Sequence, residues 1–520
     1  MKVFSSKFLL APLNKEFSFL IFIFIMSSIV DFIGYGLRES IFKAIYIVMH
    51  HFAICYIITI FLTLLPLKIK RYYKFFIILL LVINCIIDAT CVFSFNYVFD
   101  KEVPGIMTGT NTGEALEFLS VFITWRLTCI IIILFFSLFI LYRVLQHINF
   151  KPQHNVQYAI LSVFFLCILI PCVLSSKNWY NISLGKAISF YQAARTADLD
   201  NRVIPPMIVG KMHRPNNFVI VIGESFKSKN SSLYGYEKDT SPLLSKLSKE
   251  RTLLAYPNVT AAGTHTIQAF KRFMTGVDDD SVDYTKLMTL TDVLHLAGYK
   301  IAWLSNQAPI GFYQNVITRY AALCDTTVFP GHQFDDGSNN DIDEILLPTL
   351  YSLQNTLNDS LQCYIIHLMG SHPDFKKRVP ETYSKFSPKE YAKHGEILAA
   401  YDNTIAYNDS IMNEIIKSFD KKDTFLIYFS DHGLDLFDTS DNYFGHAKHN
   451  DPASEAAGRD IPFIIYVSPK FIDNNPILYQ KITTSIDKHF NTTNLIYSIM
   501  DILNVQPADS IMELKNSLFY

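Results

Sequence analysis

Hydrophobic and polar positions divide the chain into an apolar first third and a mixed remainder. Five apolar runs in the first third are each long enough to cross a bilayer as an α-helix, which takes about 20 residues. They lie at roughly 17–36, 44–66, 74–97, 119–142 and 157–175. The first run is too long, and too closely followed by others, to be a cleaved signal peptide. The pattern predicts a membrane domain of five transmembrane helices over residues 1–175.

Basic residues beside these runs predict how the helices cross the membrane. The N-terminus and the second and fourth connecting loops carry Lys2, Lys7, Lys15, Lys68, Lys70, Arg71, Lys74, Arg143 and Lys151. The opposite side has only Arg38, Lys43 and Lys101 near the runs. Because Lys and Arg accumulate in cytoplasmic loops, we expect the N-terminus in the cytoplasm. Five spans then place everything after residue 175 outside, in the periplasm if the cell is Gram-negative.

Residues 176–216 are expected to connect the membrane domain to a water-soluble one. Tyr180, Leu184, Ile188 and Tyr191 recur at helical spacing. Such a stripe lies along a bilayer surface or packs on the soluble domain. The segment that follows, VIPPMIVGKMHRPNN, has paired prolines and polar residues and is typical of a linker.

Residues 217–520 alternate short apolar runs with helical patterns. The runs are FVIVIGES, KIAWLSNQ, QCYIIHLMGSH, DTFLIYFSDHG and DIPFIIYVSP. Continuous apolar strands separated by helices indicate a mostly parallel sheet that is buried on both faces. The sequence therefore predicts an α/β domain over residues 217–520.

Polar residues gather where these predicted strands end, which is the edge at which α/β sheets bind ligands. They are Glu224, Asn306, Gln307, His372, Asp431 and His432, with His446 and His449 supplied by a later loop. Each alone is more often a cap or a hydrogen-bonding residue. Together, several carboxylates and imidazoles at one edge are typical of a zinc or manganese site.

The stretch PNVTAAGTHTIQAFKR combines a loop, Gly263 and Thr264 at the expected start of a helix. Free N–H groups at a helix start favour an anion, although a threonine there is usually only a cap. Beside a metal ion, Thr264 can have a chemical role instead. Zinc lowers the pKa of bound water from about 15.7 to about 7, and it should act similarly on a bound alcohol. Thr264 is then the fourth metal ligand and the nucleophile, beside Glu224, Asp431 and His432.

Charge and cysteine content indicate which classes of function the sequence does not support. The formal net charge is −2, so no basic footprint indicates nucleic-acid binding. Six of the eight cysteines lie in the apolar third and are expected to be packing residues. Cys324 and Cys363 remain, and the sequence leaves open whether they form a disulfide. No CxxC or Cys/His array indicates a structural zinc site.

These motifs resemble those of bacterial phosphoethanolamine transferases of the sulfatase/alkaline-phosphatase superfamily, including enzymes that modify lipopolysaccharide. VIGES followed by SLYGYEKDTSP is specific to the group, GTHT resembles its GT-x-T nucleophile motif, and SDHG with a later GH completes the pattern. The resemblance covers nearly the whole chain. It implies a membrane domain joined to a sulfatase-like (alkaline-phosphatase-like) periplasmic domain in the bacterial inner membrane.

The resemblance also implies roles for single residues. Glu224, Thr264, Asp431 and His432 form the zinc site, with manganese as the alternative metal, and Thr264 carries the covalent intermediate. His372 and His446 bind substrate or act in acid–base steps. On the substrate side Gln307 matches loosely, and Thr110 and Glu114 match in the outer loop TGTNTGEALEF. The segment between SDHG and GH differs in length from the family pattern, so His449 competes with His446.

The implied reaction moves phosphoethanolamine from phosphatidylethanolamine to Thr264, releases diacylglycerol, and passes the group to an envelope acceptor such as lipid A, lipopolysaccharide core or another glycan. A glycerolphosphate transferase shares the fold and the threonine nucleophile and is the main alternative. A sulfatase or phosphodiesterase is another, but GTHTIQ lacks the C/S-x-P-x-R setting of sulfatases. A membrane-tethered sensor with a degenerate site is the non-enzymatic alternative.

Overall fold

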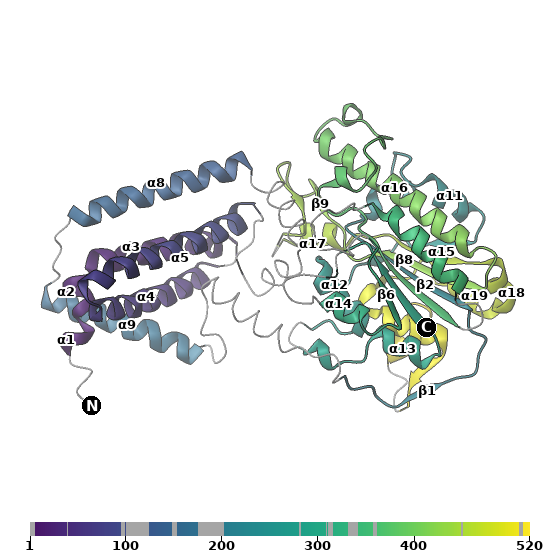
Figure 1. The fold of residues 1–520 in the computed structure, drawn as a ribbon, viewed down its shortest axis with the longest axis horizontal. Coiled ribbons are helices and arrows are strands. Elements are labelled where there is room, and N and C mark those ends of the chain that lie inside the picture. Colours follow the sequence, from purple (N-terminus) through teal and green to yellow (C-terminus); the bar gives the residue numbers. More distant parts are fainter. Residues whose placement is uncertain are drawn as a thin grey trace. The chain divides into compact units, whose positions relative to one another are not determined.

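The computed structural model describes residues 6–38, 40–94, 99, 124–147, 153–174, 202–279, 282–307, 309, 316–330, 342–356, 361–448, 451–508 and 513–520. The chain forms two compact units, one helical and one α/β (Figure 1). Most of the predicted bridge over residues 176–216, and Thr110, Glu114 and His449, lie outside the described residues.

The helical unit follows the apolar runs closely. After the short helices α1 (Ser6–Leu9) and α2 (Ala11–Lys15), its long helices are α3 (Phe17–Arg38), α4 (Ile41–Leu64), α5 (Leu67–Ser94), α8 (Trp125–His147) and α9 (His154–Leu174). Within the described residues, four of them are long and apolar enough to cross a membrane; the apolar part found in α9 is shorter, His154–Ile168. The helical membrane architecture agrees with the prediction, but the count of five spans is not confirmed.

Contacts inside this unit explain its packing. Leu20 and Ile23 of α3 and Tyr56 of α4 are fully buried in one apolar cluster. Glu16 pairs with Lys70 at 3.1 Å and with Lys74 at 2.6 Å. These ion pairs hold the start of α3 and the start of α5 at the same end of the unit, which is the arrangement that the basic residues predicted.

A seven-stranded sheet forms the centre of the α/β unit, in the order β3-β11-β8-β2-β7-β5-β6. Its strands are β2 (Asn217–Gly223), β3 (Leu253–Ala255), β5 (Lys300–Ser305), β6 (Thr326–Val328), β7 (Gln362–His367), β8 (Thr424–Ser430) and β11 (Phe463–Val467). β6, β5, β7, β2 and β8 pair in parallel, whereas β11 is antiparallel to both β8 and β3. The predicted mostly parallel sheet is confirmed.

Helices cover both faces of this sheet (Figure 1). Side chains of β2 alternate between two separate cores, with Ile220 in one and Val221 in the other. The first core lies under α12 (Thr266–Thr275), α13 (Leu290–Leu296) and α20 (Leu495–Leu503). The second lies under α11 (Pro242–Lys249), α15 (Leu346–Thr356) and α16 (Gly395–Phe419). Burial on both faces explains why these strands are continuously apolar in sequence.

Cys324 and Cys363 are both free thiols, although both belong to the α/β unit. Cys363 is fully buried in β7. The disulfide that the sequence left open is therefore not formed in this structure.

Candidate metal and catalytic centre

Glu224, Asp431 and His432 meet directly beyond the ends of two neighbouring parallel strands. In the register of β2 and β8, Gly223 lies opposite Ser430, so the residues that follow emerge side by side. Each of the three offers a ligand atom, and these atoms lie within 4.8 Å of one another. His432 Nε2 is 3.2 Å from Glu224 Oε1 and 3.6 Å from Asp431 Oδ2. We call these residues the acidic triad.

The donor set of the acidic triad fits a divalent metal ion. All three side chains are buried, and Asp431 Oδ2 has no hydrogen-bond partner among the described residues. A buried carboxylate oxygen without a partner is costly unless a cation compensates it. His432 Nδ1 lies 2.8 Å from the carbonyl oxygen of Gly433, which leaves Nε2 for the metal. Two carboxylates and an imidazole suit zinc, and manganese accepts the same donors.

The pKa shifts of the three triad residues describe the charges of the site when no metal is bound. Burial raises the pKa of Asp431 well above its usual range, and the charge of Glu224 raises it further. Burial also opposes the charge of Glu224, but His432 outweighs it and holds the pKa of Glu224 well below its usual range. Burial opposes a charge on His432 too, yet Asp431 and Glu224 raise the pKa of His432 to about 9. Without a metal, the imidazolium of His432 supplies a positive charge beside the two carboxyl groups.

The threonine hydroxyl beside the acidic triad belongs to Thr266. Its Oγ1 donates to Glu224 Oε2 at 3.2 Å and lies 3.3 Å from His432 Nε2. Thr264 Oγ1 instead lies 3.0 Å from His265 Nδ1, and no described hydrogen bond links Thr264 to the triad. The physical reason is the helix start: α12 begins at Thr266 with His265 as its N-cap, two residues later than the sequence predicted. The geometry therefore favours Thr266 over Thr264 as the fourth ligand.

Gly263 packs closely against the residues that start α12. A Cβ at this position would lie 2.8 Å from the backbone nitrogen of Ala269 and 2.9 Å from Gln268 Oε1. Gln268 Oε1 also accepts from the backbone N–H of Thr264 at 3.2 Å. The loop is thus folded tightly against the first turn of α12, which carries Thr266.

Three of the predicted substrate-side residues lie at the same edge. The ring of His446 lies 4.9 Å from that of His432, centroid to centroid. His372 interacts electrostatically with Glu224 and with His446. Gln307 Nε2 donates to Glu224 Oε2 at 3.2 Å and to the carbonyl oxygen of Leu368 at 3.1 Å. Asn306 turns away and donates to Asp343 Oδ1 at 2.9 Å, so its role is structural.

Asp343 is a supporting residue that the sequence analysis missed. Its buried carboxylate accepts from the backbone N–H groups of Met369 at 2.7 Å and Gly370 at 2.9 Å. These bonds shape the turn between β7 and His372. Asp343 starts a short 3₁₀-helix, η5 (Asp343–Ile345), and carries no local motif. Only its distant partners reveal its role.

Gly370 sets the position of Glu224. Its φ is +53°, and a Cβ there would lie 2.8 Å from both the backbone nitrogen and the carbonyl oxygen of Glu224. We expect Gly370→Ala to lower the free energy of unfolding by about 2–4 kcal/mol and to reduce bound metal, because the backbone of a ligand must shift. Thermal unfolding and metal analysis of the full-length protein measure both effects.

Gly235 offers a matched control for this prediction. Its φ is +95°, but nothing lies within 4 Å of a Cβ built there. Gly235→Ala is expected to cost only the backbone strain, about 1–2 kcal/mol, with bound metal unchanged. Equal metal loss in both variants would contradict the role given to Gly370.

A buried ion pair anchors the segment that carries His446. Lys227 Nζ lies 2.6 Å from Asp438 Oδ1, and the lysine side chain is only 3% exposed. Asp438 belongs to the hairpin of β9 (Asp435–Leu436) and β10 (Phe444–Gly445), which leads directly to His446. We expect Lys227→Met to destabilise the protein by about 1–3 kcal/mol, because Asp438 loses its partner but is partly hydrated. Limited proteolysis of the hairpin and thermal unfolding test this.

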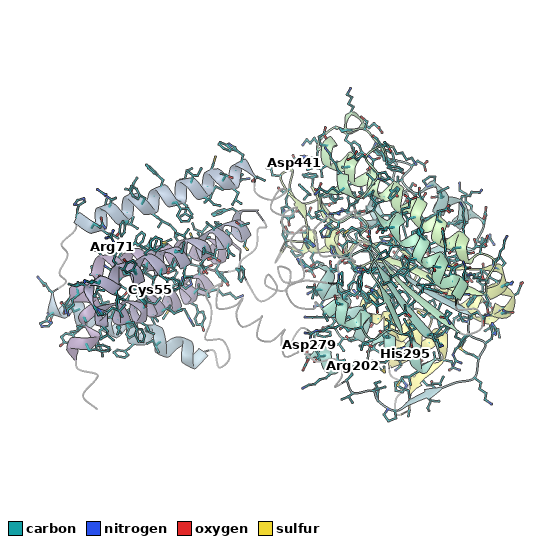
Figure 2. The ribbon with its side chains drawn as sticks, in the orientation of Figure 1. Cys55, Arg71, Arg202, Asp279, His295 and Asp441 are labelled. Atoms are coloured by element: carbon teal, nitrogen blue, oxygen red, sulfur yellow. The ribbon has the colours of Figure 1, made fainter. Side chains whose placement is uncertain are left out.

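An exposed ion pair between Lys393 and Asp441 of the same hairpin provides the comparison. Lys393 Nζ lies 2.8 Å from Asp441, which is labelled in Figure 2, and both side chains are about two-thirds exposed. Lys393→Met should leave unfolding and proteolysis unchanged, since water solvates both charges already. If it loosened the hairpin as much as Lys227→Met, burial would not be the reason for the anchor.

Comparison with known proteins identifies the class. The chain belongs to the sulfatase family, whose family model matches residues 216–505. Phosphoethanolamine transferase EptC of Escherichia coli (strain K12) is 26% identical to it, over 78% of this chain and 75% of that protein. Phosphoethanolamine transferase EptA of Helicobacter pylori is 26% identical, over 74% of each chain. The predicted resemblance to phosphoethanolamine transferases is confirmed over most of the chain.

Solved structures extend the comparison to the fold. The C-terminal periplasmic domain of Escherichia coli EptC, solved in complex with Zn, matches with a TM-score of 0.55 and 26% identity, covering 61% of this chain and 90% of that one. The integral membrane protein lipooligosaccharide phosphoethanolamine transferase A of Neisseria meningitidis matches with a TM-score of 0.66 and 18% identity, covering 98% and 97%. The whole chain therefore shares the fold of a membrane-embedded relative.

Proposed function

We propose that this protein transfers phosphoethanolamine from phosphatidylethanolamine to a cell-envelope acceptor, through a covalent intermediate on Thr266. One observation carries the proposal: the Thr266 hydroxyl lies against both Glu224 and His432 at the start of α12. A hydroxyl held between a carboxylate and an imidazole, beside a site suited to a metal, is arranged for nucleophilic attack. The similarity to phosphoethanolamine transferases supports the choice of the transferred group.

In the first half-reaction, the Thr266 hydroxyl gives up its proton and Oγ1 forms a bond to the phosphorus of phosphatidylethanolamine. The bond between phosphorus and the diacylglycerol oxygen breaks, and that oxygen takes a proton and leaves as diacylglycerol. In the second half-reaction, an acceptor hydroxyl or phosphate oxygen forms a bond to the same phosphorus and loses any proton it carries. The bond between phosphorus and Thr266 Oγ1 breaks, and Oγ1 takes up a proton. The acceptor is expected to be lipid A, lipopolysaccharide core or another glycan.

The residues around Thr266 have separate tasks in this scheme. Glu224, Asp431, His432 and Thr266 would hold a zinc ion, which supplies a Lewis acid that lowers the pKa of a hydroxyl it binds. Gln307 contacts Glu224 and keeps its carboxylate directed into the site. His372 binds phosphoryl oxygens or protonates the leaving oxygen, whereas His446 binds phosphoryl oxygens. Burial lowers the pKa of His446 well below its usual range, and the charges of His265 and His432 lower it further.

The apolar helices fit a lipid donor. Four described helices are long and apolar enough to cross a membrane. A donor with two acyl chains leaves the bilayer only slowly, so an enzyme that uses it must work at the membrane surface. We therefore place the protein in a bacterial inner membrane, with its catalytic domain on the periplasmic side.

The donor can be tested with the purified full-length protein in vesicles. With phosphatidylethanolamine, we expect diacylglycerol release and a phosphoethanolamine adduct in the intact-protein mass spectrum. Vesicles of phosphatidylglycerol test the alternative glycerolphosphate transferase, and accumulation of free phosphoethanolamine would indicate a hydrolase. Diacylglycerol release from phosphatidylglycerol alone would overturn the proposal.

A further inference from the structure

His265 lies between the two threonines of the GTHT motif and is not one of the three residues of the acidic triad. It is the N-cap residue of α12, with φ −144° and ψ 147°, and its side chain makes no capping hydrogen bond. Its ring instead stacks on that of His446, with centroids 4.8 Å apart and an interplanar angle of 8°. Its Nδ1 lies 3.0 Å from Thr264 Oγ1. The ring of His265 is therefore oriented by two contacts, the stack on His446 and the contact with the Thr264 hydroxyl.

His446 lies at the end of a short hairpin, and its ring is positioned by contacts with residues of other segments. It directly follows the two-residue strand β10, in which Gly445 has a φ of +142°. Its carbonyl oxygen accepts from the hydroxyl of Tyr443 at 2.6 Å, which restrains the backbone but not the ring. The ring contacts that of His432, at 4.9 Å and 45°, and that of His265, at 4.8 Å and 8°. A side chain in a loop keeps one rotamer only when its neighbours enclose it.

We propose that His265 is a positioning residue: its ring, held by the Thr264 hydroxyl, keeps the imidazole of His446 parallel to it and beside Thr266. The inference rests on the proposed function, because His446 acts there on the phosphoryl group. The inference also gives the residues of the GTHT motif different roles. Thr266 reacts, whereas Thr264 and His265 form a support that reaches His446, 181 positions further along the chain. A small displacement of such a group can cost about a hundredfold in rate.

Two substitutions at His265 distinguish the stacking of its ring from the hydrogen bonding of its nitrogen atoms. His265→Ser removes the ring, and we expect kcat to fall about 10- to 100-fold while KM for phosphatidylethanolamine and bound metal stay unchanged. His265→Phe keeps an aromatic ring and should recover at least half of the lost kcat on a logarithmic scale. If His265→Phe lost as much kcat as His265→Ser, an aromatic ring at this position would not support His446, and the positioning role would be overturned.

A double substitution tests whether His265 acts through His446. Adding His265→Ser to His446→Ala should cause no further loss of kcat, because the supported ring is already absent. Full additivity of the two effects would contradict the proposal. His295→Ser is the control, since His295 pairs with Asp325 in a partly exposed position away from the triad and should leave kcat unchanged.

Structures of the variants give a readout that is independent of the donor. In a crystal structure of full-length His265→Ser, we expect the His446 ring to leave its position or lose its density, whereas in His265→Phe it should stay. An ordered, unmoved His446 ring in His265→Ser would overturn the inference. If wild-type protein released no diacylglycerol, the proposed function would fail, and this comparison would still decide the role of His265.

Discussion

Thr266→Ala is expected to abolish the phosphoethanolamine adduct and to reduce transfer by on the order of 10⁴- to 10⁶-fold, as removal of a nucleophile does in other enzymes that form covalent intermediates. The reason is geometric, because Thr266 is the threonine whose hydroxyl lies 3.2 Å from Glu224 and 3.3 Å from His432. Intact-protein mass spectrometry after incubation with phosphatidylethanolamine measures the adduct, and diacylglycerol release measures the rate.

Thr264→Ala is the matched control for this experiment. Thr264 Oγ1 contacts His265 rather than the acidic triad, so its loss should leave the adduct in place and lower the rate only through the support of His446. An adduct on Thr266→Ala together with none on Thr264→Ala would return the nucleophile to Thr264, as the sequence predicted.

Asp431→Asn is expected to show opposite effects on stability with and without metal. In the metal-free protein, Glu224 and burial both disfavour the charge of Asp431, so a neutral amide should unfold at the same temperature as wild type or higher. With zinc at a thousandfold its dissociation constant, wild type should gain about 4 kcal/mol, and the variant should lose most of this gain along with its activity. Thermal unfolding with chelator and with zinc measures the difference.

Asp435 provides the control for this result. It is also a buried carboxylate, but it accepts from the hydroxyls of Thr439 and Ser454 and does not belong to the triad. Asp435→Asn should lower stability equally with and without zinc and leave the metal content unchanged. A zinc-dependent loss at Asp435, or none at Asp431, would count against the proposed metal site.

Low pH is expected to weaken metal binding. His432 must be neutral to bind a metal, whereas its carboxylate neighbours raise its pKa to about 9 in the metal-free site. Below that pH the metal must displace the proton on His432, so its apparent affinity should fall by at least about tenfold for each pH unit. Calorimetric titration with zinc between pH 8 and 6 measures the slope. An affinity independent of pH would mean that His432 carries no proton to displace.

The order of apolar and polar residues along the chain was enough to predict those features that depend only on neighbours in sequence. Long apolar runs predicted membrane helices, and short apolar runs that end in polar residues predicted strands with ligands at their carboxyl ends. Glu224, Asp431 and His432 followed from that rule, because parallel strands bring their ends to one edge whatever the loops do. The direction of β11 did not follow, since an apolar run buried on both faces looks the same in either direction.

Only the tertiary structure decided which threonine meets the triad and what supports His446. Thr264 and Thr266 are both hydroxyl residues beside a predicted helix start, and a boundary error of two residues exchanges their roles. The contact of Thr266 with His432 spans 166 positions, so no local pattern encodes it. The stack of His265 on His446 and the bonds of Asp343 to the turn before His372 likewise join distant segments. Such contacts depend on how the chain returns to one sheet edge, which is a property of the folded molecule.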